Sequence, residues 1–249
     1  MVIGEAGCVM EGAMALKLQR NGPQAAAWLY AVPTARFTSS EHRAAQYLTR
    51  GERAYLAKLG VERRRCSYVL GRYAAKQAVS RFLGGEPLSH IEIDRGVFEQ
   101  PVVKMSQGAS AAVSITHTDT WVAALAFPAG HPMALDLEEA DQSRRSVIRS
   151  QLNEREIRWI EEFAAGYGET VMLTLLWTAK EALSKVLGCG LTAALTVMGL
   201  AELDAQGGGC FRSLYENFGQ YQCLSWADPH RVLSITLPRK TLLVASEGE

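Results

Sequence analysis

The sequence predicts an α+β protein of two similar halves, because a long helical segment followed by short apolar runs occurs twice. The helical segments cover residues 61–82 and 171–187, and a break at residues 128–130 separates the halves. We therefore expect an N-terminal half over residues 1–129 and a C-terminal half over residues 130–249. The halves share this pattern of elements without a visible repeat of residues.

The first half is expected to begin its regular structure with a strand at residues 28–32. A helical region at 38–59, with a break at Gly51, precedes the long helix. Four apolar runs separated by turn residues then predict antiparallel strands at 91–94, 102–105, 112–116 and 121–127. Residues 1–25 have only weak periodicity and give no assignment.

The second half is expected to follow the same plan. A strand at residues 133–137 precedes two helices, at about 142–151 and 153–165, and then the long helix. Four further strands are predicted at 197–203, 210–215, 221–226 and 232–237.

Composition narrows the class of protein. Among the 249 residues, 26 Lys plus Arg balance 26 Asp plus Glu, which argues against nucleic-acid binding driven by bulk charge. The five cysteines form no CxxC pair, so we expect reduced thiols, no zinc site and a cytoplasmic protein. No apolar run approaches the ~20 residues that a membrane-spanning helix needs.

The helix at residues 171–187 carries one acid and one base on a polar stripe. At about 100° per residue, Glu181 and Lys185 share a face with Thr174 and Thr178, opposite an apolar face. The simplest interpretation is a solvated pair at i,i+4. The alternative is a functional pair.

Two further acids stand on the predicted strand at residues 133–137 and just after it. Side chains alternate along a strand, so Asp136 and Glu138 point to one side while Leu135 and Leu137 point to the other. Magnesium is commonly bound by a few carboxylates. A solvated strand edge would give the same pattern.

Basic residues recur on one face of the helix at residues 61–82. Arg65, Arg72 and Lys76 are spaced so that they could clamp a phosphate, although an ordinary solvated helix face would look alike. Thr116 and His117, at the end of a predicted strand, could hydrogen-bond a phosphate or a carbonyl.

Taken in order, these residues resemble the 4'-phosphopantetheinyl transferases of the long, pseudo-dimeric Sfp-like type. The resemblance extends from about Thr38 to the last strands, and its specific part is the second half of the pattern. The pattern is Gly71-Arg72-x-x-x-Lys76, then Thr116-His117, Asp136-x-Glu138, and Trp177-x-x-Lys180-Glu181-x-x-x-Lys185.

This resemblance implies a function. The family moves the 4'-phosphopantetheine arm of coenzyme A to a serine of an apo acyl or peptidyl carrier protein and releases adenosine 3',5'-bisphosphate. It implies two α+β halves related by pseudo-twofold symmetry, Mg²⁺ as the metal and coenzyme A as co-substrate. Fatty-acid, polyketide and nonribosomal-peptide carriers all fit.

The resemblance also implies roles for individual residues. The metal ligands would be Asp136, Glu138 and Glu181, and the catalytic residues would be Glu181, Lys185 and Asp136. Contacts to coenzyme A would come from Arg65, Arg72, Lys76, Thr116, His117, Lys180 and Lys185, and Glu156 matches a further acidic position.

The sequence departs from the family pattern at two positions. Ala134 stands where the family usually has glycine, and Gln100 stands where a lysine is common, which removes one positive charge near the coenzyme. Two other functions stay open at this point: a metal-dependent nuclease, and an inactive relative that only binds carrier proteins. We expect a monomer without nucleic-acid or membrane partners.

Overall fold

The structure is a computed structural model, and it confirms the α+β class with antiparallel sheets. Contacts divide the chain into two compact units. The C-terminal unit contains residues 133–241, and the N-terminal unit contains residues 10–132 together with the end of the chain from residue 242. The pseudo-twofold relation and the boundary at residues 129 and 130 stay predictions. The described residues are 11–20, 24–37, 40–104 and 110–245.

The N-terminal unit is built on a five-stranded antiparallel sheet. Its strands in spatial order are β12 (Leu242–Ala245), β1 (Gly12–Gln19), β2 (Ala25–Pro33), β6 (Trp121–Pro128) and β5 (Ala111–His117). The predicted strands at 28–32, 112–116 and 121–127 are thus confirmed. The outer strands β12 and β1 were not predicted.

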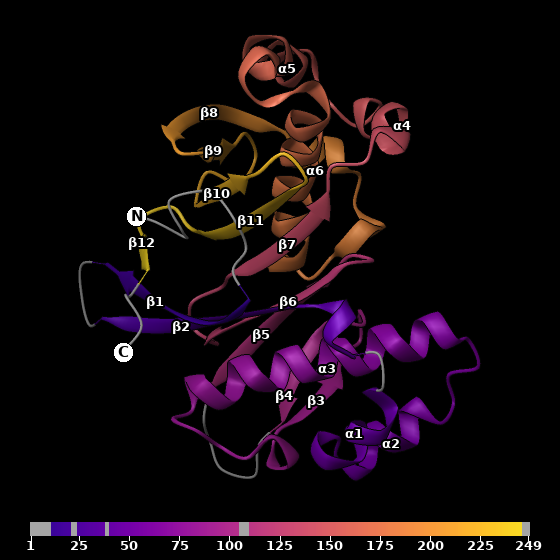
Figure 1. The fold of residues 1–249 in the computed structure, drawn as a ribbon. Helices are drawn as coiled ribbons and strands as arrows, with labels where there is room; N and C mark the ends of the chain where they lie inside the picture. Colours follow the sequence, from indigo (N-terminus) through magenta and orange to yellow (C-terminus); the bar gives the residue numbers. More distant parts are fainter. Residues whose placement is uncertain (1–10, 21–23, 38–39, 105–109, 246–249) are drawn as a thin grey trace. The chain divides into compact units, whose positions relative to one another are not determined.

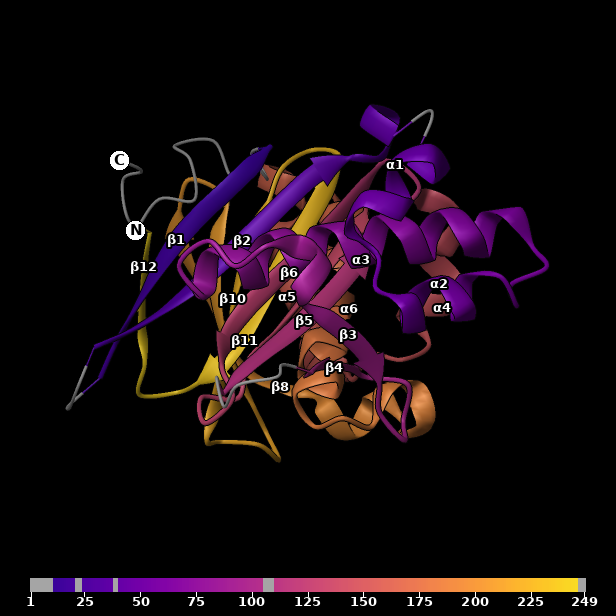
Figure 2. The ribbon, with the colours of Figure 1, turned by 90° about the horizontal axis from the view of Figure 1, so that it is seen from below.

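The helix α3 (Glu62–Phe82) lies across one face of this sheet (Figures 1 and 2) and confirms the predicted long helix. Small side chains allow the close approach, since Ala74 and Ala78 on the helix and Ala124 and Ala126 on β6 share one buried cluster. The helix ends before Gly84, whose φ of +77° glycine adopts readily.

A second group of elements belongs to the N-terminal unit, and most of its members contact α3. It comprises η1 (Thr34–Phe37), α1 (Ser40–Tyr47), α2 (Arg50–Leu56), η2 (Leu88–His90) and the hairpin β3 (Glu92–Arg95) with β4 (Pro101–Lys104). The predicted helix break at Gly51 is wrong. The break lies at Thr49, the N-cap residue of α2. Its side chain accepts a hydrogen bond from the backbone nitrogen of Glu52. Met105, at the end of a predicted strand, lies outside the described residues.

The C-terminal unit has its own five-stranded antiparallel sheet. Its strands in spatial order are β7 (Ala134–Glu139), β11 (Arg231–Pro238), β10 (Tyr221–Ala227), β9 (Cys210–Tyr215) and β8 (Leu200–Gly207). Its helical segments are η3 (Gln142–Arg144), α4 (Arg145–Arg149), α5 (Glu154–Tyr167), α6 (Glu169–Val186), η4 (Gly190–Thr192) and η5 (Leu195–Met198). All the strands predicted for this half are found, with β8 beginning after η5.

The helix α6 packs across β7, β10 and β11 on one face of the sheet, with α4 and α5 beside it (Figure 1). Gly168 makes the junction between α5 and α6 possible without a linker. Its φ of +85° is favourable only for glycine, and it ends one helix and begins the next. Among the described residues, no helix is long and apolar enough to cross a membrane.

Candidate functional site

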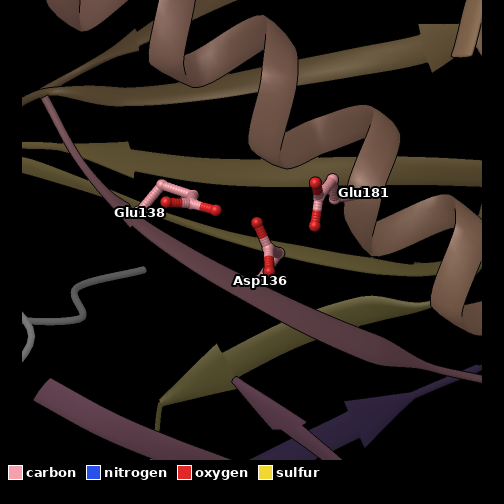
Figure 3. A group of neighbouring side chains, drawn as sticks. All are labelled: Asp136, Glu138 and Glu181. Atoms are coloured by element: carbon pink, nitrogen blue, oxygen red, sulfur yellow. The ribbon is translucent and has the colours of Figure 1, made fainter. Parts of the chain in front are cut away.

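Three carboxylates of the C-terminal unit come together at the contact between β7 and α6. Asp136 and Glu138 alternate with buried leucines along β7 and point to the same side, and Glu181 reaches them from α6 (Figure 3). One ligand oxygen from each residue lies within 4.8 Å of the others. The structure therefore brings together the three predicted metal ligands.

Burial and a neighbouring negative charge disfavour the charged forms of the two glutamates. Only 2% of Asp136 is exposed, because α6 covers its face of the strand. Burial raises the pKa of Glu181 to about 7, and the nearby charge of Asp136 adds to this effect. The pKa of Glu138 is raised by the same two causes in the same order. These shifts favour the protonated forms of Glu181 and Glu138, and a cation bound beside them would favour the carboxylates.

Two cations partly balance the three acids. Lys185 Nζ donates to Asp136 Oδ1 at 2.7 Å and to the backbone oxygen of Leu135 at 3.2 Å. Arg144 donates from an Nη atom to Glu138 Oε2 at 2.6 Å. Within the described part of the chain, Glu181 forms no salt bridge, so the solvated i,i+4 pair with Lys185 is not what the structure shows.

The donor set fits a divalent cation that prefers oxygen. Three carboxylates converge at a site with a surplus of negative charge, and carboxylate oxygens are the ligands that Mg²⁺ prefers. The chemistry of these residues thus agrees with magnesium, and Asp136, Glu138 and Glu181 are the residues that would hold it.

The rest of the predicted polar stripe on α6 is buried. The hydroxyl of Thr178 contacts that of Ser234 on β11 at 2.7 Å, and Thr174 donates to the backbone of Thr170 at 2.8 Å. A helical wheel groups residues by face, but it does not say which face the sheet covers. Thr178 thus joins the helix to the sheet, whereas Thr174 is satisfied within the helix.

Lys180 lies inside the C-terminal unit. Its ammonium donates to Glu156 Oε2 and to the backbone oxygen of Gln151, both at 2.8 Å, and only 1% of its side chain is exposed. Glu156 also accepts from the backbone nitrogens of Asn153 at 2.9 Å and Leu200 at 3.0 Å. This pair ties the start of α5, the start of β8 and the middle of α6 together, which is a structural role. The contact of Lys180 with coenzyme A stays a prediction.

Lys76 has the same surroundings in the N-terminal unit. Its ammonium is fully buried, lies 2.6 Å from Glu52 Oε2 and donates to the backbone oxygens of Tyr47 at 2.6 Å and Leu88 at 3.1 Å. Burial lowers the pKa of Lys76 while Glu52 opposes the shift. Its predicted contact with a phosphate likewise stays a prediction.

Arg72 lines a cavity of about 240 Å³ in the N-terminal unit. Its guanidinium lies 4.6 Å from the ring centroid of Tyr68, and its Nε is 3.9 Å from Glu52 Oε1 without a hydrogen-bond partner among the described residues. Arg95 lines the same cavity, stacks on Tyr55 and pairs with Glu99. Arg72 is thus a buried cation with unused hydrogen-bonding capacity.

The other predicted coenzyme contacts of the N-terminal unit differ in exposure. Arg65 is partly exposed near the start of α3 and donates to the backbone oxygens of Leu56 at 3.2 Å and Leu59 at 3.4 Å. Thr116 is buried and His117 exposed at the end of β5. Their assignment to coenzyme A stays a prediction.

Sequence reasoning gave no role in the site to Arg144 and none at all to Glu52. A signal for Glu52 exists, because Thr49-x-x-Glu52 and Asn153-x-x-Glu156 are both capping boxes. In each case a lysine follows the glutamate by 24 residues.

One family model matches part of the C-terminal unit. Residues 132–235, which include the three carboxylates and Lys185, match the family described as the 4'-phosphopantetheinyl transferase superfamily. No curated protein matches the chain.

Two solved structures are similar to part of the chain. One is a holo-(acyl-carrier-protein) synthase from Bacillus anthracis in complex with CoA (3',5'-ADP), with 21% identity and a TM-score of 0.38 over 46% of this chain and 96% of that chain. The other is a holo-ACP-synthase from Plasmodium yoelii, with 16% identity and a TM-score of 0.35 over 48% of this chain and 94% of that chain.

Proposed function

We propose that this protein is a magnesium-dependent phosphopantetheinyl transferase of the Sfp-like type. It would move the 4'-phosphopantetheine arm of coenzyme A to a serine of an apo carrier protein. The observation that carries the proposal is the cluster of Asp136, Glu138 and Glu181, which lies inside the segment that matches the transferase superfamily.

The reaction needs charge neutralisation and positioning. The serine oxygen forms a bond to the phosphorus next to the pantetheine, and the bond from that phosphorus to the oxygen of adenosine 3',5'-bisphosphate breaks. Bound Mg²⁺ would supply positive charge to the pyrophosphate oxygens. Lys185, whose ammonium lies at the edge of the cluster, would stabilise the charge moving onto the leaving phosphate.

The serine must also lose a proton. Glu181 is the carboxylate of the cluster without a salt bridge within the described residues, so it is the candidate general base. In the N-terminal unit, Arg72 has hydrogen-bonding capacity to offer a coenzyme phosphate, and we keep Arg65, Lys76, Thr116, His117 and Lys180 as proposed coenzyme contacts.

The test combines purified protein, coenzyme A, Mg²⁺ and a panel of apo carrier proteins from fatty-acid, polyketide and nonribosomal-peptide synthesis. Mass spectrometry should show one phosphopantetheine arm added to a carrier, and the addition should stop when Mg²⁺ is chelated. Asp136→Ala should abolish the transfer while the circular dichroism spectrum is unchanged. Binding of a carrier without modification would indicate an inactive relative, and cleavage of nucleic acid would indicate a nuclease.

A further inference from the structure

Arg144 contacts both the acidic cluster and α6, the helix that supplies Glu181 to this cluster. It is the last residue of η3, the first helical segment after β7, and its guanidinium donates to Glu138 Oε2 at 2.6 Å. The same guanidinium lies 5.2 Å from the ring centroid of Trp177 on α6, within the range of a cation–π contact. About a third of its side chain, 36%, is exposed, so it reaches the solvent side of the cluster.

A metal ion bound at the cluster would weaken the ion pair between Arg144 and Glu138. Glu138 is a candidate metal ligand, and a carboxylate shared between a divalent cation and an arginine is held less tightly by each, because the two positive charges repel. Lys185, the other cation at the cluster, also has the backbone oxygen of Leu135 as an acceptor. For Arg144, Glu138 is the acid in contact within the described residues.

Trp177 would hold Arg144 beside the cluster when the ion pair between Arg144 and Glu138 weakens. The indole is almost fully buried in α6 and its face would keep the guanidinium beside the cluster after Glu138 has turned to the metal. A guanidinium presents a planar fork of donors that suits the oxygens of a phosphate. A cation that is held at the cluster and has lost part of its acid partner is an anion-binding group.

We propose that Arg144 is a metal-coupled binding residue: it holds Glu138 while the metal is absent, and it binds a phosphate oxygen of the substrate when the metal takes Glu138. The chemical class of ligand is a pyrophosphate ester. This inference rests on the magnesium site of the proposed function. Arg144 should therefore weaken the binding of Mg²⁺ alone and strengthen the binding of Mg²⁺ and coenzyme A together.

The experiment measures binding and needs no turnover. Isothermal titration calorimetry gives the affinity of the full chain for Mg²⁺ alone, for coenzyme A alone and for coenzyme A with saturating Mg²⁺, in the absence of a carrier protein. The variants are Arg144→Met and its neighbour Arg145→Met, which makes the same change of charge but removes a pair with Glu169. Thermal unfolding checks that both variants fold.

For Arg144→Met we expect Mg²⁺ alone to bind severalfold more tightly, and coenzyme A with Mg²⁺ to bind about tenfold more weakly, than in the unsubstituted protein. Arg145→Met should change neither affinity, and Arg144→Lys should restore part of the coupling through its charge. Mg²⁺ affinity in Arg144→Met that is equal to or weaker than in Arg145→Met would overturn the inference while leaving the magnesium site in place. An unsubstituted protein that binds no Mg²⁺ would overturn the inference and the proposed metal site together.

Discussion

The two units contain the same buried ion pair, and they differ in what surrounds it. In each unit a capping-box glutamate accepts from a lysine on the long helix and from the backbone nitrogen of a residue outside its own helix, Ile93 in one unit and Leu200 in the other. Each lysine also donates to a backbone oxygen two residues before the cap, Tyr47 or Gln151. Among the described residues the acidic cluster occurs in one unit and the pair occurs in both, so we assign the pair to the framework that the units share.

The long helices differ at corresponding positions on either side of that lysine. One and five residues after the lysine, α6 has Glu181 and Lys185, and α3 has Gln77 and Arg81. Arg81 donates to Gln77 at 2.5 Å and lies 5.5 Å from the ring centroid of Tyr30, so this region of the N-terminal unit has no counterpart of the three carboxylates among the described residues.

The opposite difference is found four residues before the lysine. There α3 has Arg72, which lines the cavity, and α6 has the buried Leu176. The long helix therefore presents an acid to its sheet in one unit and an arginine with an unpaired Nε in the other. Substitutions at matched positions can test each part of this statement.

Removing the lysine of the buried lysine–glutamate pair in either unit should have the largest effect on stability. Lys76→Met and Lys180→Met each leave a buried carboxylate without its cation, and we expect a loss of about 3–5 kcal/mol in the free energy of unfolding from either change. Urea unfolding combined with hydrogen exchange should show lost protection in α3 for the first variant and in α6 for the second.

Two controls sharpen this result. Lys104→Met removes an exposed pair with Asp94 and should leave stability nearly unchanged. The double change Glu156→Gln with Lys180→Met should be less damaging than the sum of the single changes, because no charge is left buried alone. A rise in KM for coenzyme A that occurs only in Lys180→Met would support the contact with the coenzyme that the family resemblance implies.

Glu181 on α6 should matter far more for activity than Gln77, which occupies the corresponding position on α3. We expect Glu181→Gln to lower kcat by about a hundredfold or more, on the order of 3 kcal/mol of activation free energy, through weaker magnesium binding and loss of the base. Gln77→Ala should leave transfer to a carrier protein unchanged. Similar rates for the two variants would move the centre of the site away from α6.

The sequence predicted the parts of this site that local rules describe. Alternation along β7 placed Asp136 and Glu138 on one side, and helical spacing placed Glu181 and Lys185 on one face. It did not predict β1 and β12, because their pairing joins the two ends of the chain and no local pattern marks it.

Local sequence rules also could not predict which side chains of α3 are buried. Lys76 and Arg72 share a face of α3 with Arg65, and that face was predicted either to clamp a phosphate or to meet solvent. The structure buries Lys76 between Tyr47 of α1, Leu88 of η2 and Glu52 of α2. The first two supply backbone acceptors, and Glu52 supplies the opposite charge. The matched spacing from glutamate to lysine in both units was the visible sign, and it becomes meaningful only once the two capping boxes are compared.

The arginine of the N-terminal unit should affect binding of the coenzyme more than the chemical step. Arg72→Met should raise KM for coenzyme A by about tenfold with a smaller change in kcat, since a contact remote from the reacting centre binds ground and transition states alike. Dephospho-coenzyme A, which lacks the 3'-phosphate, should be affected less. Equal losses with both substrates would remove Arg72 from the 3'-phosphate but not from the coenzyme.

The acidic cluster should make the metal-free protein sensitive to pH. The pKa of Glu181 is raised from 4.5 to about 7 in the folded state, so its contribution to stability is complete below the lower value and is lost as the pH rises through the higher one. Without metal, the melting temperature should fall by a few degrees between about pH 5 and about pH 8. Mg²⁺ should oppose the fall because it binds the carboxylate form, and Glu181→Gln should reduce it. An unchanged slope in that variant would assign the titration to another group.

The smallest effect should come from the hydroxyl contact between α6 and its sheet. Thr178 meets Ser234, and the corresponding position on α3, two residues before the lysine, is the buried Ala74. Thr178→Ala therefore gives α6 the side chain that the other unit uses, at a cost of about 1 kcal/mol in the free energy of unfolding. The loss is modest because Ser234 keeps its contact with Ser225 at 2.8 Å. Urea unfolding should show this small change with transfer activity intact. A large loss of activity at unchanged stability would mean that the hydroxyl positions Glu181 one turn further along the helix, and that the framework and the site are not separable in this unit.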